Sequence, residues 1–262
     1  MPENSAAAPV YRSCSPAHLL RDVAAAIVDE QRARLPDLRG IVVLVPHRHA
    51  INPFERELHA AAGRQTLILP KIVTLRDLAA SVMSGLAPLP DAARLAGLYA
   101  ALRDRKWFPE RELWGITEEL AALMDELTRC RIALPRDLAD FTRQLEAAYR
   151  TRSEALNFEA RIVHELWHAM AAQGGDRPDA ETHYQLQLAR LAREADSSLY
   201  ALALPQLAPA ETAFLQEYAR RAPVTLFSAT PGNDDQRAGL FDAAWPTQAQ
   251  VPSLLDRARG FA

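Results

Sequence analysis

The sequence has 262 residues, 49% of them hydrophobic and 24% charged, which is ordinary for a protein that forms an apolar core. The formal net charge is −3, which excludes the strong overall basic field of many nucleic-acid-binding proteins, so any contact with nucleic acid must be local. No apolar run approaches the roughly 20 residues needed to span a bilayer, and no secretory signal opens the chain, so we expect a cytoplasmic protein without a membrane partner.

Strands and helices alternate along the first part of the chain. A short strand is predicted at PVYRSC (9–14), followed by a helix whose apolar residues share one face. The β-branched run IVVLV (41–45) is typical of strands that are buried on both faces of a parallel sheet. A helix over 53–62 and a further strand at TLIL (66–69) follow. This alternation predicts an α/β fold with a parallel sheet.

From about residue 74 to residue 196 almost the whole sequence has helical periodicity. Strand character returns at LYALAL (199–204) and VTLF (224–227), with a helix starting at Pro209 between them. Four helical stripes carry the apolar residues of the middle segment: Ile116, Leu120, Leu123 and Leu127; Leu138, Phe141, Leu145 and Tyr149; Phe158, Ile162, Leu166 and Met170; and Tyr184, Leu188, Leu191 and Ala195.

These patterns predict a discontinuous α/β core over residues 1–73 and 197–250. An all-helical subdomain over 74–196 is inserted between its two parts. The segment 251–262 carries an apolar helical face that nothing further along the sequence covers, so we expect it to begin a truncated following segment.

The loop after IVVLV is the place where a nucleotide-hydrolysing parallel sheet would carry its GxxxxGK[ST] phosphate loop. Here it reads PHRHAINPF, with no glycine and no lysine, and its prolines remove amide donors that phosphate binding needs. After the later strand, Pro205 and Gln206 stand where a magnesium-holding Asp-Glu pair is expected. We therefore expect a P-loop-like core that binds no ATP and needs no cofactor.

The segments VVLVPHRHAINPFERELHAA and TLILPKIVTLRDLA resemble the opening of the AddB family, the inactivated-helicase and nuclease subunit of bacterial double-strand-break repair complexes. The segment SLYALALPQLAPAETAFLQEYARRAPVTLFSATP is similar to the later strand–helix–strand of superfamily 1 helicases. The resemblance implies a P-loop-helicase-like core, a role in DNA repair and an AddA-type helicase–nuclease partner subunit. The nuclease domain and iron–sulfur cysteines of that family have no counterpart in this sequence, so neither activity is implied for it.

Two local features are candidate contacts for single-stranded DNA without sequence preference. His47, Arg48 and His49 follow a strand and are suited to phosphate, although an ordinary solvated loop is the simpler explanation for them. Thr74 and Arg76 match a DNA-touching helicase segment in the resemblance, while a helix N-cap is an alternative role for Thr74.

A literal HExxH motif lies at residues 164–168. On a helix, His164 and His168 share a face and are suited to bind Zn²⁺, with Glu165 as general base, so a zinc metallopeptidase is an alternative function. The third ligand of the extended motif is absent, and Glu181 and Glu194 lie beyond the turn-rich QGGDRPD. The helix is also explained by its apolar stripe. We therefore expect no metal at this motif.

The densest basic stretch surrounds Trp107 and Phe108, an arrangement that suits single-strand binding by charge and stacking, although a solvated helix end is the simpler explanation for it. Its basic residues are Arg94, Arg103, Arg105, Lys106 and Arg111. A structural module that binds only protein is the remaining alternative. The sequence thus favours a non-catalytic module within a nuclease complex.

Overall fold

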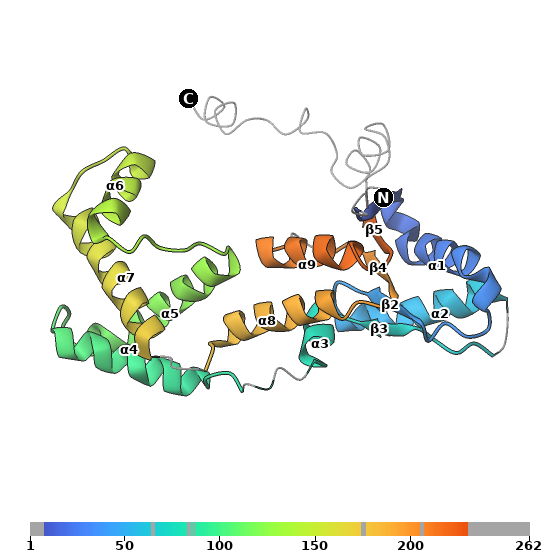
Figure 1. Cartoon of the computed structure of the whole chain (residues 1–262), viewed down its shortest axis with the longest axis horizontal. Helices are drawn as coiled ribbons and strands as arrows, with labels where there is room; N and C mark the ends of the chain where they lie inside the picture. Colours follow the sequence, from blue (N-terminus) through green and yellow to red (C-terminus); the bar gives the residue numbers. More distant parts are fainter. Residues whose placement is uncertain are drawn as a thin grey trace, which may run out of the picture. The chain divides into compact units, whose positions relative to one another are not determined.

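A computed structural model describes residues 8–63, 66–82, 85, 87–173, 177–204 and 207–229, with the side chains of 171–173 left out. In this part of the chain five strands form one parallel sheet in the order β1-β5-β4-β2-β3, which confirms the predicted α/β class (Figure 1). The strands are β1 (Val10–Cys14), β2 (Ile41–Leu44), β3 (Lys71–Val73), β4 (Ser198–Leu202) and β5 (Val224–Ala229).

The chain divides into two compact units. A sheet unit comprises residues 10–72 and 200–203 and continues from 225, and a helical unit comprises 73–199 and 204–224. The division at residue 72 lies beside the predicted boundary at 73. Helix α9 (Pro209–Ala219), which the sequence assigned to the α/β core, groups with the helical unit because it packs along α8 (Ala180–Arg193). The predicted insertion of one domain into the other stays a prediction, and the segment 251–262 lies outside the described residues.

The core of the sheet unit forms where α1 (Leu19–Glu30) and α2 (Ile51–Ala62) pack on each other and on the strands. Each helix contributes large apolar side chains at helical spacing, and each such side chain stabilises the fold by roughly 1.5–3 kcal/mol when it leaves water. Helix α2 ends at Gly63, whose φ of 58° suits a residue without a Cβ. The fully buried members of this core include Val23, Ile27, Ile41, Val43, Phe54 and Leu58.

The predicted strand at residues 66–69 is wrong in position. This segment forms only a single parallel bridge, Ile68 with Asp37, and the strand beside β2 is β3, after Pro70. Proline has no N–H to donate to a ladder, so it separates the bridged segment from the strand that follows. The segment instead exchanges backbone hydrogen bonds of 2.9 and 3.0 Å with the chain at Pro36 and Leu38.

The phenol of Tyr200 links strand β4 to helix α1. Its hydroxyl donates to Glu30 at 2.9 Å and accepts from Gln31 at 2.8 Å, while Arg12 of β1 forms an ion pair with the same Glu30. Tyr200 is 3% exposed, and burial together with the nearby Glu30 raises its pKa to about 12. One side chain thus ties together parts of the sheet unit that lie about 170 residues apart in the sequence.

The helical unit holds two further apolar clusters, built largely from three of the four predicted stripes, although Leu123 and Tyr149 of those stripes are exposed. One cluster lies among α4, α5 and α7, and the other joins α6 and α7 to Leu134. No helix among the described residues is both long and apolar enough to cross a membrane. Besides α8 and α9, the helices of this unit are α3 (Leu75–Ala80), α4 (Asp91–Arg105), α5 (Leu113–Arg129), α6 (Leu138–Tyr149) and α7 (Glu154–Gln173).

We predict that Tyr200→Phe lowers the free energy of unfolding at pH 7 by about 1 kcal/mol, because two buried hydrogen bonds are removed. The pKa of Tyr200 is raised from 10.0 to about 12 in the fold, so its stabilisation is complete below pH 10 and is lost as the pH rises towards 12. Urea unfolding at pH 7 and between pH 9 and 12 measures both effects. The variant should show a shallower loss of stability at high pH.

Tyr149→Phe is the matched control, because Tyr149 is 68% exposed. It should change neither the urea midpoint at pH 7 nor the slope of stability against pH. Equal pH profiles for the wild type and Tyr200→Phe would refute the role assigned to this phenol.

Candidate functional site

The carboxyl edge of the sheet, next to strand β2, is the first candidate site. Strand β2 lies between β3 on one side and β4 on the other, and β1 reaches the far side of β4. The chain continues from β2 to β3 on one side and from β4 to β5 on the other side. The loops that follow β2 and β4 therefore begin next to each other at the same edge of the sheet. Parallel α/β sheets bind ligands at such switch points.

The loop after β2 presents basic side chains to solvent at this edge. His47, Arg48 and His49 are exposed, while Ala50 is buried where the 3₁₀ turn Arg48–Ala50 leads into α2. The imidazoles of His47 and His49 lie 6.2 Å apart between ring centroids. The first turn of α2 contains no acidic residue, so no carboxylate there neutralises the positive end of the helix. The loop is suited to meet a phosphate group through side chains.

The loop after β4 offers no carboxylate among the described residues. Strand β4 ends at Leu202, and Ala203 adopts a φ of 36°, in the left-handed region that costs a residue with a Cβ about 1 kcal/mol. The backbone N–H of Ala203 donates to the carbonyl of Phe227 in β5 at 2.7 Å, so the end of β4 stays hydrogen-bonded to its neighbouring strand. Pro205 and Gln206, where the sequence lacks the expected acidic pair, lie outside the described residues.

Thr74 forms the helix N-cap that the sequence offered as its alternative role. Its hydroxyl accepts from the backbone N–H of Asp77 at 3.2 Å and donates to the Asp77 carboxylate at 2.8 Å. Both hydrogen bonds satisfy groups at the start of α3. The DNA contact expected for Thr74 stays a prediction.

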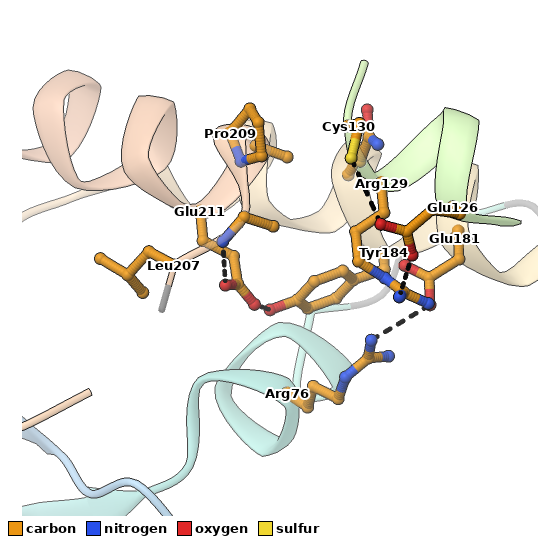
Figure 2. Close-up of a pocket in the computed structure, with 12 residues that line it drawn as sticks. Arg76, Glu126, Arg129, Cys130, Glu181, Tyr184, Leu207, Pro209 and Glu211 are labelled. Carbon is orange, nitrogen blue, oxygen red and sulfur yellow. Dashed lines mark hydrogen bonds and ion pairs between the residues drawn. The ribbon is translucent and has the colours of Figure 1, made fainter. Parts of the chain in front are cut away.

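Arg76, the other residue of that segment, lines a pocket of about 310 Å³ in the helical unit (Figure 2). Its guanidinium donates to Glu181 at 3.1 Å and lies 4.7 Å from the centre of the Tyr184 ring. Burial by itself lowers the pKa of Arg76, but the hydrogen bond and charge of Glu181 outweigh burial and raise that pKa. Arg129 contacts the same carboxylate at 3.5 Å, so two arginines share Glu181.

The pocket continues to Glu211 at the start of α9. The Tyr184 hydroxyl donates to one carboxylate oxygen of Glu211 at 2.9 Å, and the other oxygen accepts from the backbone N–H of Ala208 at 2.9 Å (Figure 2). Burial, followed by the charge of Glu211, raises the pKa of Tyr184 well above its usual value. The phenol is therefore neutral and serves to fasten α8 to α9.

Sequence reasoning missed the network that includes Arg76, in which Glu181 joins Arg76 to Arg129, and Tyr184 joins α8 to Glu211. The available signal was the placement of Glu181 and Glu211 in the first turns of their helices, where carboxylates are favoured. Nothing in a single sequence shows that the starts of α8 and α9 meet, so the network depends on tertiary packing. The charges of Arg76, Arg129 and Glu181 in this network are paired with one another.

The two histidines of the HExxH motif share one backbone acceptor. The Nε2 atoms of His164 and His168 lie 2.9 and 3.1 Å from the carbonyl oxygen of Pro135, and the two rings are 4.5 Å apart. A carbonyl only accepts, so both Nε2 atoms must carry a hydrogen and cannot at the same time bind a metal. His164 is buried and stacks on Phe141. The histidines thus fasten α7 to the segment before α6.

The carboxylates near the motif are engaged elsewhere. Glu165 lies 3.4 Å from Arg105, Glu181 pairs with two arginines, and Glu194 pairs with Arg190 at 2.8 Å. Among the described residues no three His, Cys, Asp or Glu side chains come together in a way that suits a metal ion.

The basic stretch around Trp107 does not form a uniformly free cationic surface. Arg94 is mostly buried and pairs with Asp125 at 2.5 Å, and Arg103 and Arg111 each lie beside the next acidic residue. The guanidinium of Arg105 lies 5.4 Å from the centre of the Trp107 ring. Of these arginines, Arg94 is held inside the helical unit, whereas Arg103 and Arg111 are exposed and pair only with the next residue along the chain.

Comparison with models of protein families and with curated protein sequences finds no match to this chain. The resemblance to the AddB family therefore stays a prediction.

We predict that the chain does not bind ATP at physiological concentration, because the loop after β2 supplies neither the glycine amides nor the lysine that a phosphate loop requires. Titration with a fluorescent ATP analogue and Mg²⁺ should give no saturable signal tighter than about 100 µM, roughly −5.5 kcal/mol. Saturable binding that unlabelled ATP displaces would contradict this prediction.

We predict further that His164 and His168 hold no zinc, because their Nε2 atoms share a backbone acceptor and no third ligand among the described residues lies beside them. Elemental analysis of protein purified without a histidine tag should find zinc well below one equivalent. Zinc near one equivalent that is absent from His164→Ala but retained in His18→Ala, a control at an exposed histidine, would support the metallopeptidase instead.

Proposed function

We propose that the chain is a helicase-like module without ATP chemistry, which contributes DNA contact and subunit assembly to a double-strand-break repair complex of the AddB type. In this proposal the DNA is single-stranded and contacted without sequence preference, and the partner is an AddA-type motor subunit. The module itself is not an enzyme.

One observation carries the proposal. The strand order makes β2 and β4 neighbours, so the edge at which such sheets bind nucleotides carries the loop with His47, Arg48 and His49. This edge has the strand order of a ligand-binding edge, but exposed basic side chains stand where a phosphate-cradling loop would be. It therefore suits a phosphate of the DNA backbone better than a bound nucleotide.

The expected DNA affinity is modest. Arg48 supplies the permanent charge of the loop, and the chain as a whole has a net charge of −3. Binding that rests on few phosphate contacts is weak, insensitive to sequence and strongly dependent on salt. Such affinity is sufficient for a module that works beside a motor, because tethering raises the effective concentration of the DNA.

We predict that labelled single-stranded oligonucleotides bind more tightly than duplexes, with affinity that falls steeply as salt rises. Replacing His47, Arg48 and His49 together by alanine should weaken single-strand binding several-fold. The slope of affinity against salt should fall by about one for each phosphate that the variant no longer neutralises. Fluorescence anisotropy across a salt series measures both quantities.

Arg32→Ala with Arg39→Ala is the matched control in the same unit, because these side chains are 77% and 71% exposed and lie between α1 and β2, before the strand whose far end carries the loop. If this control weakens single-strand binding equally, the loss reflects the overall charge of the protein and not a contact made by the loop. Tight binding that ignores salt, or strong preference for one sequence, would exclude the proposed mode of contact.

A further inference from the structure

A groove runs between helices α8 and α9 in the helical unit. Its volume is about 570 Å³, and the two helices that form it lie side by side in Figure 1. This groove and the pocket around Arg76 lie along the same helix pair and share Gln185 and Ala210 in their linings. Of the residues that line the two, Arg131, Arg193 and Arg220 belong to the groove alone.

Apolar side chains form the floor of the groove. Leu188 and Phe214 are buried beneath it, while Leu186 remains 48% exposed at its side. Alanines at 189, 192 and 213 keep the floor shallow, so a further backbone can approach closely. Leu186 is half exposed beside an apolar floor, so covering it with another apolar surface would stabilise the resulting complex.

The rim of the groove is basic. Arg131, Arg193 and Arg220 line it, and Glu217 is the one acidic side chain among the described residues of the lining. Glu217 is paired with Arg220, so its charge is already neutralised. Arg193 donates to a backbone carbonyl at 3.3 Å, and Arg131 has no acidic partner in the described part of the chain. The rim thus carries two positive charges that the described part of the protein does not compensate.

The walls of the groove are fixed in advance. Tyr184 of α8 donates to Glu211 of α9, and the Tyr218 hydroxyl of α9 donates to the carbonyl of Ser197 at 2.8 Å. Both phenols are buried, and burial raises the pKa of Tyr218 to about 12, so these hydrogen bonds persist at neutral pH. A groove whose walls do not have to be ordered loses less entropy when it binds.

We propose that this groove binds an amphipathic helix of a partner protein, with a narrow apolar stripe flanked by acidic residues. The stripe lies on the alanine floor beside Leu186, and the acidic flanks face Arg131 and Arg193. A helix in a groove is a recurring mode of recognition, and charges at the rim select the partner and steer its approach. The inference rests on the assembly part of the proposed function and on none of its DNA contacts.

The test uses the full chain and two labelled 18-residue peptides of alanine, leucine and glutamate or lysine. Both carry the same leucine stripe; the acidic peptide has glutamates beside it, and the basic peptide has lysines there. Anisotropy at low salt should show at least about tenfold tighter binding of the acidic peptide. Arg131→Glu with Arg193→Glu should reverse this preference, and Leu186→Asp should weaken binding of the acidic peptide.

Arg103→Glu with Arg111→Glu is the matched control, because these exposed arginines lie elsewhere in the helical unit and have the same change in charge. It should leave the preference unchanged. Circular dichroism checks folding, and if the double Glu variant does not fold, Arg131→Gln with Arg193→Gln should abolish the preference without reversing it.

Equal binding of the two peptides, or a preference that survives in a folded rim variant, would overturn the inference. If sedimentation shows that the chain self-associates and that the rim variant does not, the groove binds a second copy of this chain and the inference is wrong. Loss of oligonucleotide binding in the rim variant would assign the groove to nucleic acid and also overturn the inference. Alanine replacement of residues 47–49 should leave peptide binding intact. A failure of the DNA proposal can therefore be distinguished from a failure of the groove proposal.

Discussion

The parallel pairing of β4 beside β2 is the constraint on which the sheet and its candidate site depend. Without β4, the strand β2 has only β3 as a neighbour, and β1 and β5 have no route into the same sheet. Tyr200 reinforces the pairing from within, because its hydroxyl bonds to the end of α1 while its ring packs in the core. The pairing also brings the loops after β2 and β4 to one edge, so the architecture and the candidate DNA contact share a single cause.

Much of this fold follows from local sequence pattern. A run such as Ile41–Leu44 is apolar at every position, which fits a strand covered on both faces, and the stripe through Ile162 and Leu166 fits a buried helix face. The third strand is harder to place because TLIL and KIV both have strand character, and only pairing partners decide between them. Ile68 lies against Asp37, whereas Lys71–Val73 lies beside β2. Local preference is equal here, so tertiary contacts choose.

The candidate sites are less accessible to sequence than the fold. The exposed loop at His47–His49 can be predicted, because the apolar run of the preceding strand changes there to polar residues. The HExxH spacing is equally visible, but its chemistry is set by the carbonyl of Pro135, some 30 residues away, which no spacing rule includes. Arg76 likewise gains its partner Glu181 from a helix about 100 residues further along. Motifs specify side-chain types, and packing specifies what those side chains meet.

The register of β1 against β5 has a consequence for synthesis of the protein. Val10 pairs with Thr225 and Cys14 with Ala229, so the first strand meets its only neighbour in the described sheet roughly 200 residues later. At about 5–20 residues per second, a ribosome takes on the order of 10–40 seconds to deliver that neighbour. During this interval β1 leaves the ribosome with unpaired backbone donors and acceptors, a state that invites pairing with the wrong strand. Its exposed Arg12, and the near absence of large apolar side chains after Tyr11, limit that hazard while the chain is being made.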